Sequence, residues 1–198
     1  IDFHRSVRQG AAEVIYGAGK TPEQIRGIVC TMGERGCQNI LVTRIGQETA
    51  DYLKETIPMD YHAIPRLGIA FPEERKKRGH IVVATGGTSD MAVAEEAALT
   101  AEAMGNRVTR LYDVGVAGLH RLLSNLDVLM SARCVVAVAG MEGALASVVG
   151  GLVVGVSECL AATFINSTYR DSVAFIILIV VLIVRPTGLF GKKGITKV

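Results

Sequence analysis

The sequence predicts an α/β protein in which a parallel, doubly wound sheet domain follows a small α/β domain and precedes a hydrophobic helical tail. From residue 80 onward, strand-like apolar runs alternate with helix-like segments through short connections. Such alternation is typical of parallel sheets with helices on both faces. A shorter alternation fills the first 78 residues, and the chain becomes almost entirely apolar from about residue 148. These three observations predict domains at 1–78, 79–151 and 152–198.

The first domain contains a well-marked helix start. Thr21 can cap the helix, Pro22 suits its first position, and Gln24 can complete a capping box. We expect this helix to end near Gly36, since glycine adopts the left-handed conformation at little cost. The other predicted elements are strands at 13–16, 39–43 and 61–64 and a helix at 47–55. The charged run at 73–78 is interpreted as a solvated linker.

The second domain alternates more regularly. Residues 80–85 form a continuously apolar run, as expected of a strand covered on both faces. The pattern further predicts strands at 108–112 and 134–139, helices at 91–104 and 118–130, and a helix opening at 140–143. Ligands of open parallel sheets bind at the carboxyl ends of the strands. The loops at 86–90, 113–118 and 140–143 are therefore expected to form the site.

The first of these loops reads GGTSD. Its glycines allow backbone amides to approach a phosphate, Thr88 and Ser89 supply hydroxyl groups, and Asp90 adds an acid. The same letters also suit a plain helix N-cap, so this loop alone leaves both interpretations open.

The other two loops also carry polar groups. Asp113 ends a strand ahead of a glycine-containing loop that includes Gly115, and His120 and Arg121 follow in the next helix. Arginine can hold a phosphate and histidine can move protons, although a lone histidine is usually structural. In the third loop Glu142 precedes Gly143. Three such loops at one edge indicate a site more strongly than any one of them.

Composition narrows the classes of function. The net charge is +2 and no basic stripe is interleaved with aromatics, so a nucleic-acid partner is not predicted. The four cysteines show no CxxC spacing and no histidine cluster, which indicates neither a metal site nor a disulfide framework. We expect reduced, cytoplasmic thiols, with Cys134 buried in an apolar strand. The N-terminal residues contain no apolar segment of a secretory signal.

The tail differs from both domains. Residues 173–184 are uniformly apolar but shorter than the roughly 20 residues that span a bilayer. Lysines at 192, 193 and 197 match the positive charge found on cytoplasmic sides of membranes. We expect helices at 150–165 and 172–184 that leave the sheet edge near 135–139 incompletely covered. The tail makes membrane association through residues 148–190 an alternative to a fully cytoplasmic location.

Long motifs in the first three quarters of the chain resemble an enzyme family. They read HRSVRQGAAEVIYGAGKTPEQI, GTSDMAVAEEAALTAEAMGN, YDVGVAGLHRLL and VVAVAGMEGALASVVGGL. Residues 1–151 resemble the nicotinic acid adenine dinucleotide carboxylase/hydrolase of nickel-pincer cofactor biosynthesis. The domain from His80 is also distantly similar to the class I carboxyaminoimidazole ribonucleotide mutase of purine synthesis, which implies a flavodoxin-like sheet.

The resemblance implies carboxylation of the pyridinium ring and hydrolysis of the phosphoanhydride, giving pyridinium-3,5-biscarboxylic acid mononucleotide and AMP. Carbon dioxide or bicarbonate would be the co-substrate, no cofactor would be tightly bound, and magnesium is compatible. A homo-oligomer is also implied. Carried onto this chain, Asp113, Glu142 and His120 are acid/base candidates. The implied substrate-binding residues are Thr88, Ser89, Asp90, Gly115, Arg121 and Gly143.

The chain departs from the family after about residue 151. The family's later Asn-Ser-Cys, whose thiolate activates the ring, does not occur in this sequence. Instead, the segment from GGLVVGVSECLAATF to VRPTGLFGKK resembles the C-terminus of a branched-chain amino-acid transporter permease. Cys159 lies in this apolar segment and is not expected to replace the nucleophile. We therefore expect an impaired, chimeric carboxylase. A carboxylase or mutase of aminoimidazole ribonucleotide and a membrane permease fragment are the alternatives.

Overall fold

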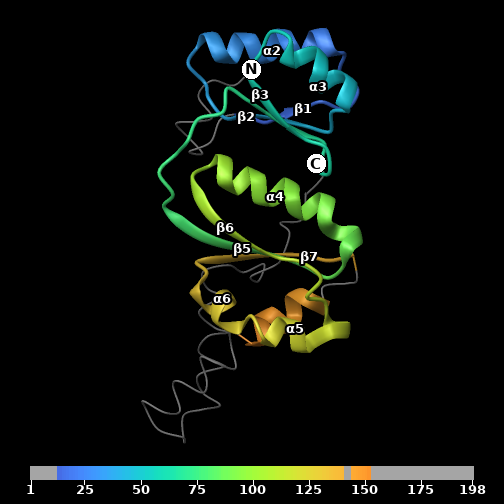
Figure 1. The fold of residues 1–198 in the computed structure, drawn as a ribbon, viewed down its shortest axis with the longest axis vertical. Helices are drawn as coiled ribbons and strands as arrows, with labels where there is room; N and C mark the ends of the chain where they lie inside the picture. The colour runs from blue at the N-terminus through green and yellow to red at the C-terminus, as the bar shows by residue number, and fades with distance from the viewer. Residues whose placement is uncertain (1–12, 141–143, 153–198) are drawn as a thin grey trace, which may run out of the picture. The chain divides into compact units, whose positions relative to one another are not determined.

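The computed structural model describes residues 13–140 and 144–152. The chain divides into two compact units, Ile1–Leu145 and Ala146–Val198, each considered by itself. The first unit contains two sheets with their helices (Figure 1). Its strands are β1 (Ile15–Tyr16), β2 (Ile40–Thr43), β3 (Met59–His62), β4 (Leu67–Ala70), β5 (Gly79–Thr85), β6 (Asn106–Leu111) and β7 (Cys134–Val138). Its α-helices are α2 (Pro22–Glu34), α3 (Gln47–Lys54), α4 (Met91–Ala103), α5 (Leu119–Leu123) and α6 (Leu126–Ser131).

The N-terminal sheet has the strand order β1-β2-β4-β3. Strand β1 runs parallel to β2, whereas β4 is antiparallel to both β2 and β3. The third strand, predicted at 61–64, occupies Met59–His62, and β4 was not predicted. Strand β4 reads LGIA, and a run of four residues that includes a glycine is too short to give a periodic signal. All four residues of β4 are buried, because the strand is paired with β2 on one side and β3 on the other.

Helix α2 begins as its sequence predicts. The Thr21 hydroxyl accepts a hydrogen bond from the Gln24 amide at 3.3 Å, and the Gln24 side chain accepts from the Thr21 amide at 3.0 Å. This reciprocal pair is the capping box, with proline at the first helical position. The helix ends at Glu34, and Gly36 adopts a φ of +77° just beyond it. The predicted start and end are confirmed.

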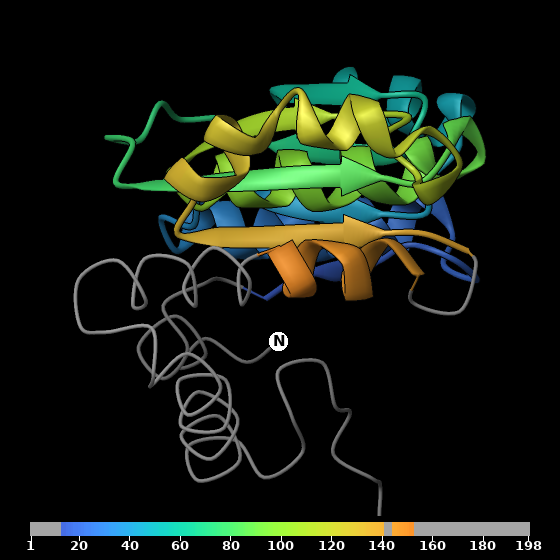
Figure 2. The same ribbon diagram turned by 90° about the horizontal axis from the view of Figure 1, so that it is seen from below.

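The second sheet is wholly parallel, with β5 between β6 and β7. The central strand is the most buried of the three, as its continuous apolar sequence predicts. Figure 1 shows α4 on one side of this sheet and α5 and α6 on the other, and Figure 2 shows β5 and β7 running alongside each other. The α/β class and the parallel second sheet are confirmed, while the finer flavodoxin-like assignment stays a prediction.

The helix predicted at 118–130 is wrong in its continuity. A 3-10 turn at Val116–Gly118 leads into α5, and a break separates α5 from α6. Two polar side chains at the break bond to backbone carbonyls of the preceding turn. The Ser124 hydroxyl donates to the His120 carbonyl, and the Asn125 amide donates to the Arg121 carbonyl, both at 2.8 Å. Such bonds compete with the helical ladder, so the helix is interrupted here.

Cys134 is exposed, which corrects the prediction that it is buried. It is the first residue of β7, and among the described strands β7 lies at the sheet edge, paired with β5 alone. The rest of β7 is half-buried. The apolar residues that follow Cys134 in the sequence indicated burial. Its side chain is exposed because it stands at the end of an edge strand.

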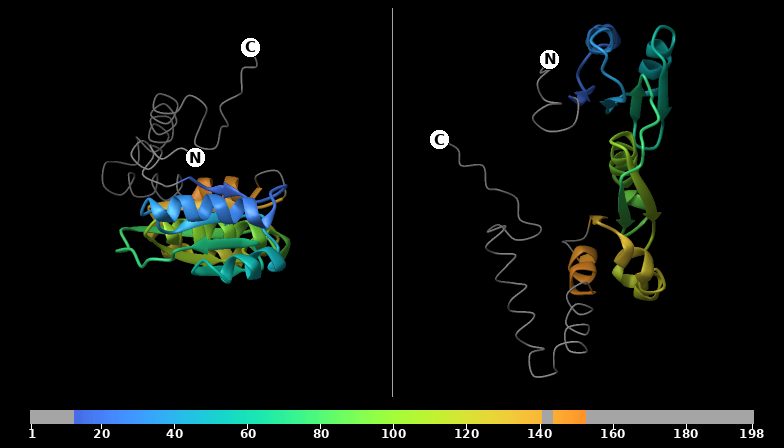
Figure 3. Two further views of the ribbon diagram at one scale, coloured as in Figure 1. Left: turned by 90° about the horizontal axis from the view of Figure 1, so that it is seen from above. Right: turned by 90° about the vertical axis from the view of Figure 1, so that its left-hand side faces the viewer.

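Helix α4 contacts both sheets. Ala94 and Ala98 pack with Val83 of β5 in one apolar cluster. Leu99 packs instead with a cluster from β2 and β4 that includes Leu41 and Leu67. The right-hand view of Figure 3 shows α4 where the two sheets approach each other. This helix therefore links the N-terminal sheet to the sheet that carries the candidate site.

Two expectations concern other segments. The linker at 73–78 is exposed throughout, which confirms its assignment as a solvated connection. Within 13–140 and 144–152, no helix is long and apolar enough to cross a membrane. The tail helices predicted at 150–165 and 172–184 fall almost wholly outside the described residues, although 144–152 are helical. The domain boundaries after 78 and 151 stay predictions.

Candidate functional site

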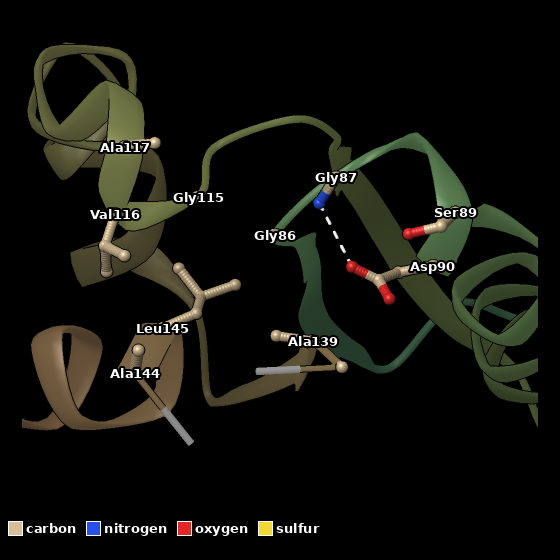
Figure 4. Close-up of a pocket in the computed structure, with 11 residues that line it drawn as sticks. Gly86, Gly87, Ser89, Asp90, Gly115, Val116, Ala117, Ala139, Ala144 and Leu145 are labelled. Carbon is tan, nitrogen blue, oxygen red and sulfur yellow. Dashed lines mark hydrogen bonds between the residues drawn. The ribbon is translucent and has the colours of Figure 1, made fainter. Parts of the chain in front are cut away.

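A pocket lies at the carboxyl edge of the second sheet, where parallel α/β sheets bind ligands (Figure 4). It encloses about 240 Å³. All three predicted loops contribute to it. The lining residues are Gly86, Gly87, Ser89, Asp90, Gly115, Val116, Ala117, Ala139, Gly140, Ala144 and Leu145. The predicted site residues Ser89, Asp90 and Gly115 are thus brought together.

Asp90 provides the carboxylate of this pocket. One of its oxygens, Oδ2, accepts a hydrogen bond from the Gly87 amide at 3.1 Å, drawn as the dashed line in Figure 4. The other, Oδ1, lies 3.7 Å from where a Cβ at Gly140 would stand. The Asp90 side chain makes no capping hydrogen bond to α4. It instead accepts from the amide of Gly87, the residue that precedes the 3-10 turn Thr88–Asp90, so Asp90 caps that turn while it also lines the pocket.

Gly115 is required by a close approach between two loops. A Cβ at this position would stand 2.3 Å from the Gly86 carbonyl oxygen, far inside van der Waals contact. The backbone of the second loop can therefore lie against the glycines of the first only when residue 115 has no side chain. This contact brings Val116 and Ala117 to the pocket wall opposite Asp90 (Figure 4).

Asp113 stands at the end of β6 in the left-handed conformation, with a φ of +57°. Thr85, at the end of β5, supports this turn twice. Its hydroxyl oxygen accepts from the Asp113 amide and its carbonyl accepts from the Val114 amide, both at 2.9 Å. Thr85 is fully buried and was not a predicted site residue. Its position immediately before a Gly-Gly turn is the sequence signal that could have identified it.

The Asp113 carboxylate accepts a hydrogen bond from the Arg121 guanidinium. Both side chains are about half exposed to solvent. An exposed ion pair of this kind contributes little to stability, so its charges can exchange partners readily. The structure thus pairs an acid/base candidate with a nucleotide-binding candidate, although neither lines the pocket.

The remaining predicted residues are placed differently. Thr88 and His120 are exposed and do not line the pocket. His120 lies in the first turn of α5, where its backbone carbonyl accepts from Ser124. Glu142 and Gly143 lie outside the described residues, so their predicted nearness to Asp113 is not tested.

The pocket combines one carboxylate, backbone amides and apolar side chains. A carboxylate accepts hydrogen bonds from ribose hydroxyls, as acids do in other nucleotide sites. The walls formed by Val116 and Leu145 suit the face of a flat ring. Among the described residues, no group of three or more histidine, cysteine, aspartate or glutamate side chains could hold a metal ion. The geometry defines a candidate ligand site at the carboxyl edge of the parallel sheet.

A family model matches the N-terminal part of the chain, which precedes the pocket residues in sequence. Residues 1–71 match the family model described as LarB/PurE-like N-terminal domain, which supports a LarB-like family. The chain is 36% identical over 163 residues to an uncharacterized protein of Methanocaldococcus jannaschii, covering 77% of this chain and 63% of the relative. The chain thus spans somewhat under two thirds of that relative's length.

A second similarity concerns transport proteins. The chain is 36% identical over 69 residues to the high-affinity branched-chain amino acid transport system permease protein LivH of Salmonella typhimurium. It is 44% identical over 52 residues to the permease protein BraD of Pseudomonas aeruginosa. These matches cover 35% and 26% of this chain and only 22% and 17% of the permeases. They are short local similarities.

Proposed function

We propose that the carboxyl-edge pocket binds the nicotinate nucleotide half of nicotinic acid adenine dinucleotide. The whole chain would derive from an enzyme that carboxylates this ring and hydrolyses the phosphoanhydride. The observation that carries the proposal is the convergence of Ser89, Asp90 and Gly115 from two different loops onto one cavity. The LarB/PurE-like match of residues 1–71 supports the same class of reaction.

Each polar group has a role in this proposal. Asp90 accepts hydrogen bonds from the ribose hydroxyls, and Ser89 and the Gly87 loop contact the ribose phosphate. Arg121 leaves Asp113 to pair with the anionic substrate, since guanidinium groups bind phosphate and carboxylate well. In a chain that also held the nucleophile, the freed Asp113 carboxylate would accept the ring proton that carboxylation releases, with His120 and Glu142 as the other acid/base candidates.

The chain is expected to bind the dinucleotide without carboxylating it. A pyridinium carbon attacks carbon dioxide only after a nucleophile has added to the ring, and the family's Asn-Ser-Cys is absent from these 198 residues. Binding and turnover are therefore separate predictions.

Aminoimidazole ribonucleotide is a second candidate substrate. The reaction would then be that of a carboxylase or a mutase. The observation that favours it is the LarB/PurE-like match of residues 1–71, which is equally compatible with this reaction. The pocket of about 240 Å³ does not distinguish the two candidates, because each would place one mononucleotide in it.

Calorimetric titration of the full chain distinguishes the two substrates. We expect nicotinic acid adenine dinucleotide to bind and Asp90→Asn to weaken binding at least about tenfold, because a charged hydrogen bond is lost. Asp127→Asn, an exposed acid in α6, is the matched control and leaves the affinity unchanged. Tighter binding of aminoimidazole ribonucleotide would favour the second candidate. No binding of either nucleotide would refute both.

Formation of the biscarboxylated mononucleotide by the purified chain would contradict the second prediction. Its loss in Cys159→Ala would then assign the nucleophile to Cys159.

The permease similarities favour a further role, membrane association of the segment at 148–190. Co-sedimentation of the full chain with phospholipid vesicles tests that role, and recovery of all the protein in the supernatant would exclude it.

A further inference from the structure

A cluster of ionisable side chains joins α4 to β6 beside the pocket but outside it. Arg110 of β6 donates from Nε to both carboxylate oxygens of Glu95 at 3.2 Å. Its two terminal nitrogens donate to Glu102, at 2.7 and 3.0 Å. The Tyr112 hydroxyl donates to Glu95 Oε1 at 2.7 Å. Glu95 thus receives hydrogen bonds from two residues near the end of β6.

This cluster connects the two sides of the candidate site. Glu95 lies on α4 little more than one turn after Asp90, which supplies the pocket carboxylate. Tyr112 immediately precedes Asp113, which pairs with Arg121. Glu95 and Glu102 therefore both bond α4 to Arg110 of β6, and of these two carboxylates Glu95 is the one that also receives the Tyr112 hydroxyl, next to Asp113.

The apolar contact between α4 and the sheet is made on the helix side by small residues. The helix meets the sheet through Ala94 and Ala98, both fully buried. Alanine side chains allow close approach but project little, so they resist sliding along the helix axis less than large interlocking side chains do. Directional hydrogen bonds to charged groups have the geometric specificity that the alanine contact lacks.

We infer that Glu95 is a positioning residue that sets the axial register of α4 against β6 and so holds Asp90 at the correct distance from Asp113. Glu95 touches no ligand in this role. It acts through the backbone of two elements, and its effect on ligand affinity rests on the proposed function.

The hydrogen bonds of this cluster are largely shielded from solvent. The side chains of Glu95 and Arg110 are 19% and 29% exposed. Tyr112 also packs with the buried group of Val83, Ala94 and Ala98. Burial together with hydrogen bonding to Glu95 raises the pKa of Tyr112 to about 12, so its hydroxyl remains a donor throughout the physiological range.

The test compares three variants of the full chain. Glu95→Gln and Tyr112→Phe each remove part of the link, whereas Glu96→Gln changes the next residue of the same helix. Glu96 forms a long pair of 3.9 Å with Arg44 away from the cluster. Amide hydrogen exchange, measured well below the unfolding transition, is followed at Gly87 and Val114. The Gly87 amide is protected by Asp90, and the Val114 amide by Thr85.

We expect faster exchange at both amides in Glu95→Gln and Tyr112→Phe, and no change in Glu96→Gln. The dissociation constant for nicotinic acid adenine dinucleotide should rise about two- to thirtyfold in the first two variants, the usual range for residues that act through a network. A change in overall stability alone would leave exchange at these two amides in step with the rest of the chain, and that result would overturn the inference.

The exchange measurement needs no ligand. Faster exchange at Gly87 and Val114 without nucleotide binding by the unmodified chain would uphold the positioning role and refute the proposed function. Nucleotide binding that is unaffected by Glu95→Gln, with unchanged exchange, would uphold the proposed function and refute the positioning role.

Discussion

At the scale of single residues, backbone requirements shape the site as much as side-chain chemistry does. Asp113 adopts a left-handed conformation, which aspartate tolerates better than most residues do. Thr85 stabilises that conformation through two hydrogen bonds. Gly115 is necessary because its loop touches the Gly86 carbonyl. Motif letters alone identified Asp113 and Gly115 as candidates, but not these reasons.

Substitution of Gly115 tests the contact directly. Gly115→Ala places a methyl group 2.3 Å from the Gly86 oxygen, so the two loops must separate. We expect a loss of about 1–3 kcal/mol in the free energy of unfolding, the usual range for overpacking. Gly27→Ala, in α2 with no atom within 4 Å of the added Cβ, should instead be neutral or stabilising. Urea denaturation followed by circular dichroism measures both, and equal effects would contradict the contact.

The raised pKa of Tyr112 gives a prediction for alkaline pH. Burial, followed by hydrogen bonding to Glu95, raises its pKa from 10 to about 12. The neutral phenol is favoured in the folded state, so its stabilising effect is complete below pH 10 and is lost as the pH rises through about 12. The difference in absorbance at 295 nm between the unmodified chain and Tyr112→Phe should show a midpoint near 12. A midpoint near 10 would contradict the hydrogen-bonded, partly buried phenol.

At the scale of elements, local signals located most helices and strands. The Thr21, Pro22 and Gln24 pattern placed the start of α2 correctly because a capping box involves only neighbouring residues. The continuity of α5 and α6 was predicted wrongly, because apolar periodicity outweighed Ser124 and Asn125. Strand β4 was missed because its pairing partners, not its own four residues, define it.

The capping box can be measured as a contribution to stability. Thr21→Ala removes the oxygen that accepts from the Gln24 amide. We expect a loss of about 1 kcal/mol in the free energy of unfolding. Thr21→Ser retains an acceptor at the same position and should be close to the unmodified chain in thermal or urea denaturation. A serine variant as unstable as the alanine variant would show that the hydroxyl is not responsible.

At the scale of the first unit, α4 integrates the two sheets. Its weak amphipathic character follows from having two buried faces, one toward each sheet. The chain of contacts from Leu41 and Leu67 through Leu99 to Ala98 therefore couples the N-terminal sheet to the helix that carries Asp90. Leu41 and Leu67 lie in the segment that matches the LarB/PurE-like model, and they contact the helix that follows Asp90.

Truncation of Leu99 tests this coupling. Leu99→Ala should cost about 2–5 kcal/mol, because it removes a buried side chain of α4 from the cluster that it forms with β2 and β4. Val93→Ala, in the same helix but 53% exposed, should cost much less. Hydrogen exchange should show loss of protection in both β2 and β5 of the Leu99 variant. Loss confined to β2 would contradict the coupling.

The sequence by itself determined the α/β class, the parallel second sheet, the helix start at Thr21 and the three loops that line one edge. These features follow from periodicity, capping and strand–helix alternation, which act over a few residues or repeat along the chain. Only the tertiary structure decided that Ser89 and Asp90 enter the pocket while Thr88 and His120 do not. It also decided that Asp113 pairs with Arg121, that Thr85 supports the turn and that Cys134 is exposed. The physical reason is that these properties depend on contacts between residues far apart in the chain, and no local pattern records them.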